Sequence, residues 1–149
     1  MEKLEFMKAA IKEAYIGINN LEGGPFGAVV VKDGVVIGRG HNQVVRKNDP
    51  TCHGEMMAIR DACKRLGTFD LSGAVIYTTG EPCPMCRGAI LWANIDHVYY
   101  GCNIYDTEEI GFRDNKFYQF DPSSFQEELG RNECLELYKD YMKTNKTNY

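Results

Sequence analysis

The residues most able to do chemistry lie in two short stretches of the chain. His53 and Glu55 stand two positions apart. Cys83 and Cys86 stand three positions apart, with a proline on each side of Cys83. At this spacing both thiols share one face at the start of a helix, where they can bind one ion. His53 would complete three zinc ligands and leave the fourth tetrahedral position to water, as in catalytic zinc sites.

Glu55 is expected to have a different role from the ligands. Two residues along a helix point it away from His53, so the two side chains are poorly placed to bind one ion in the same way. A carboxylate beside the metal-bound water can instead take its proton and deliver it to a leaving amine. The metal lowers the pKa of such a water to about 7. The pattern H-x-E…P-C-x-x-C is characteristic of zinc-dependent base deaminases.

The cysteines also fit two other interpretations. A lone C-x-x-C is also typical of structural zinc sites and of redox pairs. A structural site needs a fourth ligand, and Cys52, the nearest candidate, adjoins His53 and points in another direction. A redox pair needs no H-x-E upstream. We interpret Cys52, Cys63, Cys102 and Cys134 as structural or incidental thiols, since no secretion signal precedes them.

Composition favours a soluble protein that acts on a small molecule. The chain has 149 residues, which suits one domain, and a net charge of −4. No apolar run reaches the 18 or so residues of a membrane span, so we expect a cytoplasmic protein. Without a basic stripe the chain is poorly equipped to hold a phosphate backbone, and no nucleic-acid partner is expected.

Hydrophobic periodicity predicts the elements that must position these residues. Apolar residues at helical spacing from Leu4 to Ile18 predict a first helix, and Asp33-Gly34 predicts a type I′ hairpin turn. The predicted strands are 28–32, 35–38, 74–78, 97–101 and 116–120. The other predicted helices begin near His53 and Pro84, and a last one spans about 124–142.

This order predicts one α/β domain over residues 1–149. Strands separated by helices favour parallel pairing, and the hairpin adds one antiparallel pair. We therefore expect a three-layer α/β/α architecture with a central mixed five-stranded sheet and helices on both faces.

Several further motifs carry a family resemblance over essentially the whole chain. They are Gly23–Ala28, Asn48–Thr51, His53–Glu55, Ala58–Arg60, Glu81–Cys86, Gly88–Ile90, Trp92–Ala93 and Gly111–Asp114. With these motifs the sequence resembles the cytidine deaminase superfamily, and among its members the small bacterial guanine deaminases. The resemblance implies a cytidine-deaminase-like fold and one Zn²⁺ per chain, bound by His53, Cys83 and Cys86. It also implies Glu55 as proton shuttle, and hydrolysis of guanine to xanthine and ammonia in purine catabolism or salvage.

The resemblance also implies substrate contacts. Asn42 and Asp114 match positions that hydrogen-bond the purine, Gly54 lines the pocket, and Phe26 and Trp92 are candidates for stacking on the base. A closed pocket needs such polar groups, because an unpaired polar edge costs about 1–3 kcal/mol. The alternatives are a turn cap for Asn42, a solvated acid for Asp114, and core packing for Phe26 and Trp92.

The carboxy-terminal segment is expected to join two subunits. In the resembled family this segment is exchanged within a homodimer, and its last tyrosine closes the partner's pocket. Residues from about 121 to 149, and Tyr149 itself, match by position. The alternative for Tyr149 is a frayed terminus.

The zinc motif is shared by the whole superfamily and therefore does not identify the base. Cytosine, a pterin or triazine-like ring, guanosine or cytidine, and wobble adenosine in tRNA are the rival substrates. Many of the resembled deaminases carry alanine where this chain has Gly54, and glycine also occurs there in fungal cytosine deaminases. A zinc-stabilised binding module is the alternative without catalysis, but such a module has no need of Glu55.

Overall fold

The structure is a computed structural model that describes residues 2–144, 147 and 149. The chain forms two compact units, which meet between Tyr118 and Gln119 in the sequence. The strands of the first unit are β1 (Gly27–Lys32), β2 (Val35–His41), β3 (Ala74–Gly80) and β4 (His97–Cys102). Its helices are α1 (Lys3–Asn19), α2 (Val44–Lys47), α3 (Gly54–Leu66), α4 (Pro84–Trp92), α5 (Ile104–Glu109) and α6 (Asp114–Tyr118).

The first unit has a mixed sheet in the order β2-β1-β3-β4. The hairpin between β1 and β2 turns at Asp33 and Gly34, whose φ angles of 50° and 76° fit the predicted type I′ turn. β3 and β4 are parallel, as expected, but β1 pairs antiparallel with both β2 and β3. The expectation of a single antiparallel pair was wrong, because the α3 crossover joins β2 to β3 and leaves β1 between them.

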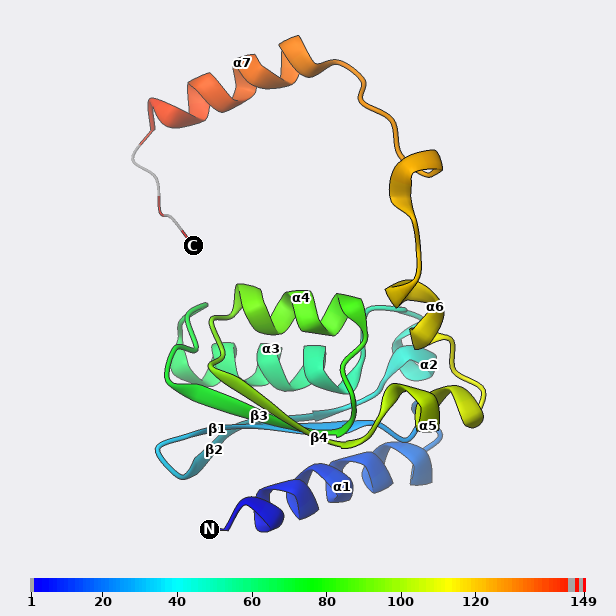
Figure 1. The fold of residues 1–149 in the computed structure, drawn as a ribbon. Coiled ribbons are helices and arrows are strands. Elements are labelled where there is room, and N and C mark those ends of the chain that lie inside the picture. The colour runs from blue at the N-terminus through cyan, green and yellow to red at the C-terminus, as the bar shows by residue number, and fades with distance from the viewer. Residues whose placement is uncertain (1, 145–146, 148) are drawn as a thin grey trace. The chain divides into compact units, whose positions relative to one another are not determined.

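Helices cover both faces of this sheet, which confirms an α/β fold with a mixed sheet (Figure 1). Along β1 the side chains alternate between two apolar clusters. Ala28 and Val30 pack with residues of α3 and α4, whereas Val29 and Val31 pack with residues of α1. The alternation follows from the period of two residues along a strand.

Close backbone contacts bring α3 onto the sheet. A Cβ atom at Gly38 would lie 2.6 Å from the Ala58 carbonyl oxygen, and one at Gly40 would lie 2.5 Å from the Ala58 nitrogen. Only glycine allows this approach of strand and helix. It brings the start of α3, and His53 before it, to the end of β2.

The predicted fifth strand at Lys116–Phe120 was wrong, and the sheet has four strands in the described residues. Most of that segment forms α6 instead. The Tyr118 hydroxyl donates to the carbonyl of Pro82, and the Arg87 guanidinium lies 4.9 Å from the centre of the Tyr118 ring. These tertiary contacts of Tyr118 stabilise the helix and override the preference of aromatic residues for strands.

The second unit contains a 3₁₀ turn η1 (Pro122–Ser124) and the helix α7 (Arg131–Met142). The helix expected from about Ser124 therefore begins later. Asp121 caps the 3₁₀ turn through the Ser123 amide, and Gly130, with a φ of 71°, stands as the N-cap of α7. Within the described ranges, every helix is too short or too polar to span a lipid bilayer.

Candidate active site

Three potential metal ligands meet where α3 and α4 begin. His53 is the residue just before α3, and Cys83 is the residue just before α4. Both residues have extended backbones, with ψ angles of 158° and 169°, so each stands as the N-cap just outside its helix. Cys86 lies in the first turn of α4. The positive ends of the helix dipoles favour ionised thiols at these positions.

The spacing of the three donor atoms suits zinc. His53 Nδ1 lies 3.6 Å from Cys83 Sγ and 3.6 Å from Cys86 Sγ. All three donor atoms lie within 4.8 Å of one another. Tetrahedral zinc, with bonds of about 2.3 Å to sulfur and about 2.05 Å to nitrogen, separates these ligands by about 3.6 Å. Both nitrogen–sulfur separations therefore match those of a zinc site.

A hydrogen bond joins the two thiols. A hydrogen bond from Cys86 lowers the pKa of Cys83 to about 4, and the same bond raises the pKa of Cys86. The hydrogen bond to Cys83 also raises the pKa of His53. Because the three groups are in contact, they titrate as a unit. A metal ion of charge +2 would take the place of the proton in the bond between the thiols and stabilise both sulfurs as thiolates.

Glu55 is a buried carboxylate in the first turn of α3. Only 7% of its surface is exposed, and burial raises the pKa of its carboxyl to about 7. A group with this pKa can both accept and donate a proton at neutral pH. Burial thus provides the property that its proposed role requires.

A cavity of about 580 Å³ opens beside this cluster. Its lining includes His53, Glu55 and Cys83. Of the residues predicted to bind substrate, Phe26, Asn42 and Asp114 also line it; the other lining residues are Gly24, Val44, Val45, Pro50, Thr51, Gly80, Glu81, Pro84, Met85, Phe112, Arg113 and Phe117. The structure therefore brings the chemical groups and three of the predicted recognition groups to one cavity.

Asn42 is buried and lines the cavity, and its side chain also caps a turn, which is the alternative role expected from the sequence. Its side-chain oxygen accepts a hydrogen bond from the Val44 amide at 3.0 Å, which caps the start of α2. Its backbone amide donates to the Phe26 carbonyl at 2.9 Å. Since the side-chain oxygen faces Val44, the NH₂ group is the part of the amide that remains to donate to another acceptor.

Asp114 begins α6 and is half-buried. Burial raises the pKa of its carboxyl, the negative charge of Cys83 raises it further, and His53 acts in the opposite direction. Asp114 is therefore within electrostatic reach of the metal ligands, unlike a fully solvated acid.

An aromatic pair forms part of the cavity wall, and the sequence pointed to only one of its members. The rings of Phe26 and Phe112 meet edge to face, with centroids 4.9 Å apart. A Cβ atom at Gly24 would lie 2.8 Å from the Phe112 ring and 2.9 Å from the Phe26 ring. Phe112 lies in the Gly111–Asp114 motif, but no periodicity predicts a contact across 86 positions of the chain.

Three predicted substrate contacts lie elsewhere. Trp92 ends α4 with 67% of its surface exposed, which also excludes core packing within this unit. Gly54 is buried, and a Cβ atom there would lie 3.0 Å from the Phe26 carbonyl oxygen. Tyr149 belongs to the second unit. None of the three is among the residues that line the cavity in the described structure.

Comparison with known proteins places this arrangement in a family. The profile of the cytidine and deoxycytidylate deaminase zinc-binding region matches residues 1–102. Guanine deaminase of Bacillus subtilis is 50% identical over 114 residues, which are 76% of this chain and 73% of that protein. The tRNA-specific adenosine deaminase of Aquifex aeolicus is 43% identical over 67% of this chain and 66% of its own length.

Solved structures agree with the sequence comparison. The X-ray structure of Bacillus subtilis guanine deaminase matches with a TM-score of 0.94 and 41% identity, over 100% of this chain and 99% of that one. A structure from a study of tRNA:A34 deaminases matches with a TM-score of 0.66 and 44% identity, over 69% and 78%. The chain therefore belongs to the cytidine and deoxycytidylate deaminase family and is a zinc-dependent hydrolytic deaminase with one Zn²⁺ site per chain.

Proposed function

We propose that this enzyme hydrolyses guanine to xanthine and ammonia, as part of purine catabolism or salvage. One observation carries the proposal: similarity to guanine deaminase continues past the shared zinc-binding region. The family profile ends at residue 102, but the guanine deaminase structure matches 100% of the chain. The added part contains Asp114, which lines the cavity.

The side chains support the following division of work. His53, Cys83 and Cys86 would hold a zinc ion, which would supply the Lewis acidity that makes water a nucleophile at neutral pH. Glu55 accepts a proton from the attacking water. A C–O bond forms at C2 of guanine, the C2–N bond breaks, and Glu55 returns the proton to the departing nitrogen, which leaves as ammonia. Because Glu55 is buried, bulk water does not compete for this proton.

Recognition of the base is assigned to groups on the cavity wall. The Asn42 NH₂ group suits a ring nitrogen or carbonyl oxygen, and the Asp114 carboxylate suits a ring N–H. Guanine presents both kinds of group. Phe26, braced by Phe112, offers an aromatic face or edge to the planar ring. Gly54 contributes indirectly, since it lies against the Phe26 backbone. Trp92 is exposed and does not line the cavity, so no contact with the base is assigned to it.

Wobble adenosine in tRNA is the second candidate substrate, because several tRNA-specific adenosine deaminases are 43–45% identical to this chain. The charge disfavours it. The chain carries 17 basic and 21 acidic residues and a net charge of −4. Binding to a nucleic acid backbone depends on basic side chains that displace counterions.

We also propose a homodimer in which residues from about 121 to 149 are exchanged. No residue of α7, all of which the structure describes, is buried, although the helix carries Leu137, Tyr138 and Met142. Burial of these apolar side chains against a second subunit would stabilise the dimer. Tyr149 would then approach the partner's cavity. Residues 145, 146 and 148 lie outside the described part of this segment.

A cytoplasmic location is consistent with the cysteines. All six lie in the described part of the chain, and none forms a disulfide. Free thiols of this number are preserved in a reducing compartment. Cell fractionation tests this assignment, and recovery in an oxidising compartment would contradict it.

The proposed substrate predicts a clear order of activity on a panel of bases. We expect the zinc-loaded enzyme to release ammonia from guanine and to convert it to xanthine. Cytosine, cytidine, guanosine, a pterin and an adenosine-containing tRNA stem-loop should react at least about a hundredfold more slowly, because a hydrogen-bonding site rejects ligands that leave its groups unpaired. If guanine is inert while another compound is turned over, guanine is refuted as the substrate. The assignment of hydrolytic deamination would still hold.

Glu55→Gln should separate metal binding from catalysis. The amide keeps the shape of Glu55 but cannot shuttle a proton, so we expect about one zinc per chain and a loss of about 10²–10⁴-fold in kcat. Ammonia release and metal analysis on the same sample measure both quantities. Glu109→Gln makes the same chemical change at the exposed end of α5 and should be neutral. A Glu55→Gln enzyme with full activity would exclude the assigned role.

Asp114→Asn should weaken guanine turnover and leave zinc in place. The amide is nearly isosteric but loses the negative charge, and we expect kcat/KM to fall by at least about tenfold. Asp33→Asn is the matched control, since Asp33 lies in the exposed hairpin turn, where asparagine is well tolerated. Equal kinetics in the two variants would return Asp114 to the role of a solvated acid.

Exchange of the tail predicts rescue between two defective chains. In a co-refolded mixture of Glu55→Gln and Tyr149→Ala, half of randomly formed dimers are mixed, and each mixed dimer holds one site with an intact Glu55 and the partner's Tyr149. About a quarter of the wild-type sites should therefore be restored. Activity no greater than the sum of the separate samples would contradict exchange of a functional Tyr149.

A further inference from the structure

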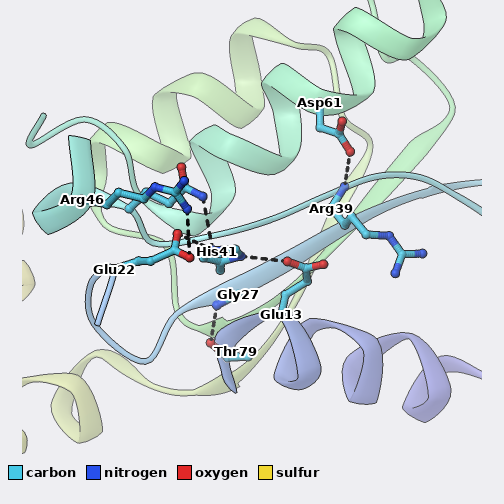
Figure 2. A network of polar contacts seen from close by, with 9 residues as sticks. Glu13, Glu22, Gly27, Arg39, His41, Arg46, Asp61 and Thr79 are labelled. Atoms are coloured by element: carbon cyan, nitrogen blue, oxygen red, sulfur yellow. Dashed lines mark hydrogen bonds and ion pairs between the residues drawn. The ribbon is translucent and has the colours of Figure 1, made fainter. Parts of the chain in front are cut away.

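A second cluster of polar side chains lies beside the cavity and takes no part in the chemistry described so far. Its centre is His41, the last residue of β2 and the neighbour of Asn42. His41 Nδ1 lies 2.9 Å from Glu13 Oε2, and His41 Nε2 lies 2.9 Å from Glu22 Oε2 (Figure 2). The side chains of His41, Glu13 and Glu22 are 12%, 11% and 5% exposed. We call these three residues the histidine clamp.

Contacts with two carboxylates favour a charged imidazole at the centre of the clamp. Ionised carboxylates only accept hydrogen bonds, so a ring that contacts one at each nitrogen must donate from both. Burial opposes the charge on His41, but the hydrogen bonds to Glu13 and Glu22 outweigh burial and raise its pKa. Burial likewise acts against the ionised Glu22, yet His41 and Arg46 lower its pKa overall.

The other groups around the clamp come from α1 and from the residues before and within α2. α1 contributes Glu13 and the close backbone of Gly17, where a Cβ atom would lie 2.8 Å from the His41 ring. The residues before and within α2 contribute Gln43, an uncharged amide 3.2 Å from Nε2, and Arg46, whose Nη1 lies 3.2 Å from Glu22 Oε1. The ring is therefore enclosed by α1, the following loop and α2.

Glu22 connects the clamp to the cavity wall. Its side chain contacts both His41 and Arg46, and its backbone carbonyl accepts hydrogen bonds from the amides of Val45 and Arg46. These two amides belong to the start of α2, which has no cap from Gln43. Val45, together with the neighbouring Val44, lines the cavity. A shift of Glu22 would therefore shift this wall.

Asn42 is held at the same junction. Its side-chain oxygen caps the Val44 amide, and the space around it is closed, since a Cβ atom at Gly23 would lie 2.1 Å from that oxygen. Asn42 thus has His41 on one side in the chain and the clamped α2 on the other. It has no room to adjust independently of them.

We propose that His41 is a positioning residue of the active site, which as an imidazolium clamped between Glu13 and Glu22 holds Asn42 and α2 in the arrangement that binds the base. The assignment of the base contact to Asn42 rests on the proposed function. The clamp itself is a property of the substrate-free protein, and it can be tested there.

The pH dependence has a definite sign. His41 has a folded-state pKa above the ordinary value of about 6.5. The clamp is therefore complete below that value and is lost as pH rises through the folded-state pKa. Deprotonation removes the hydrogen bond from the ring to one of the two carboxylates, so KM for guanine should rise on the alkaline side more than kcat falls.

The test uses His41→Gln, with His97→Gln as the matched control on the exposed strand β4. The glutamine amide cannot donate in two opposite directions, as the imidazolium ring does. KM should therefore rise about tenfold, while zinc content is kept and kcat changes less. The alkaline rise in KM should also disappear. His97→Gln should behave as the wild type. An unchanged KM with an unchanged pH profile in folded His41→Gln would overturn the proposal.

Amide hydrogen exchange without substrate makes the test independent of the proposed function. In His41→Gln the amides of Val44, Val45 and Arg46 should exchange at least about tenfold faster, because their acceptors on Asn42 and Glu22 are no longer held. Unchanged exchange would refute the clamp even if guanine proves to be the wrong substrate. Inert guanine with faster exchange would refute only the proposed substrate.

A pair of glutamate variants covers the case in which His41→Gln fails to fold. Glu22→Gln and Glu13→Gln each remove one negative charge that contacts the His41 ring, but only Glu22 also contacts α2. The proposal therefore expects a larger rise in KM and in α2 exchange for Glu22→Gln. Equal effects of the two variants, or a larger effect of Glu13→Gln, would show that His41 serves stability alone.

Discussion

The close meeting of two helix starts, those of α3 and α4, is the constraint on which the active site depends. His53 and Cys83 each stand immediately before a helix, and their donor atoms converge to 3.6 Å. This convergence requires α3 to lie flat against β2, which the glycines at positions 38 and 40 allow. Metal binding would add free energy to a contact that backbone packing has already formed. The same packing buries Glu55 and raises the pKa of its carboxyl to about 7.

Chemistry and recognition come from different kinds of structure. The metal ligands and Glu55 lie on helix starts anchored to the sheet, where geometry is tightly held. Asn42 lies in the loop between β2 and α2, and Asp114 begins the short helix α6. Both residues depend on local polar contacts for their position. Asn42 depends on the cap of α2 and the clamp at His41, and Asp114 on the anchoring of α6 through Tyr118. Loops of this kind are where related enzymes change substrate while they keep the reaction.

Local signals in the sequence predicted the hairpin turn, the first helix and the metal ligands, because each depends on residues close together or on a spacing that chemistry demands. The strand predicted at 116–120 was wrong because tertiary contacts of Tyr118, invisible in a local window, favour a helix. Phe112 and the His41 clamp were missed for the same reason. Their partners lie far along the chain, at Phe26 and at Glu13, and no spacing rule connects them. Predicting the antiparallel β1–β3 pair would have required the strand order, in which β1 lies between β2 and β3.

The most direct test of the account is a crystal structure of zinc-loaded Glu55→Gln protein with guanine. This variant should bind the base without consuming it. The account predicts zinc on His53, Cys83 and Cys86, and guanine in the cavity with hydrogen bonds to Asn42 and Asp114. Zinc on other ligands, or guanine bound outside the cavity without contact to Asn42 and Asp114, would contradict it.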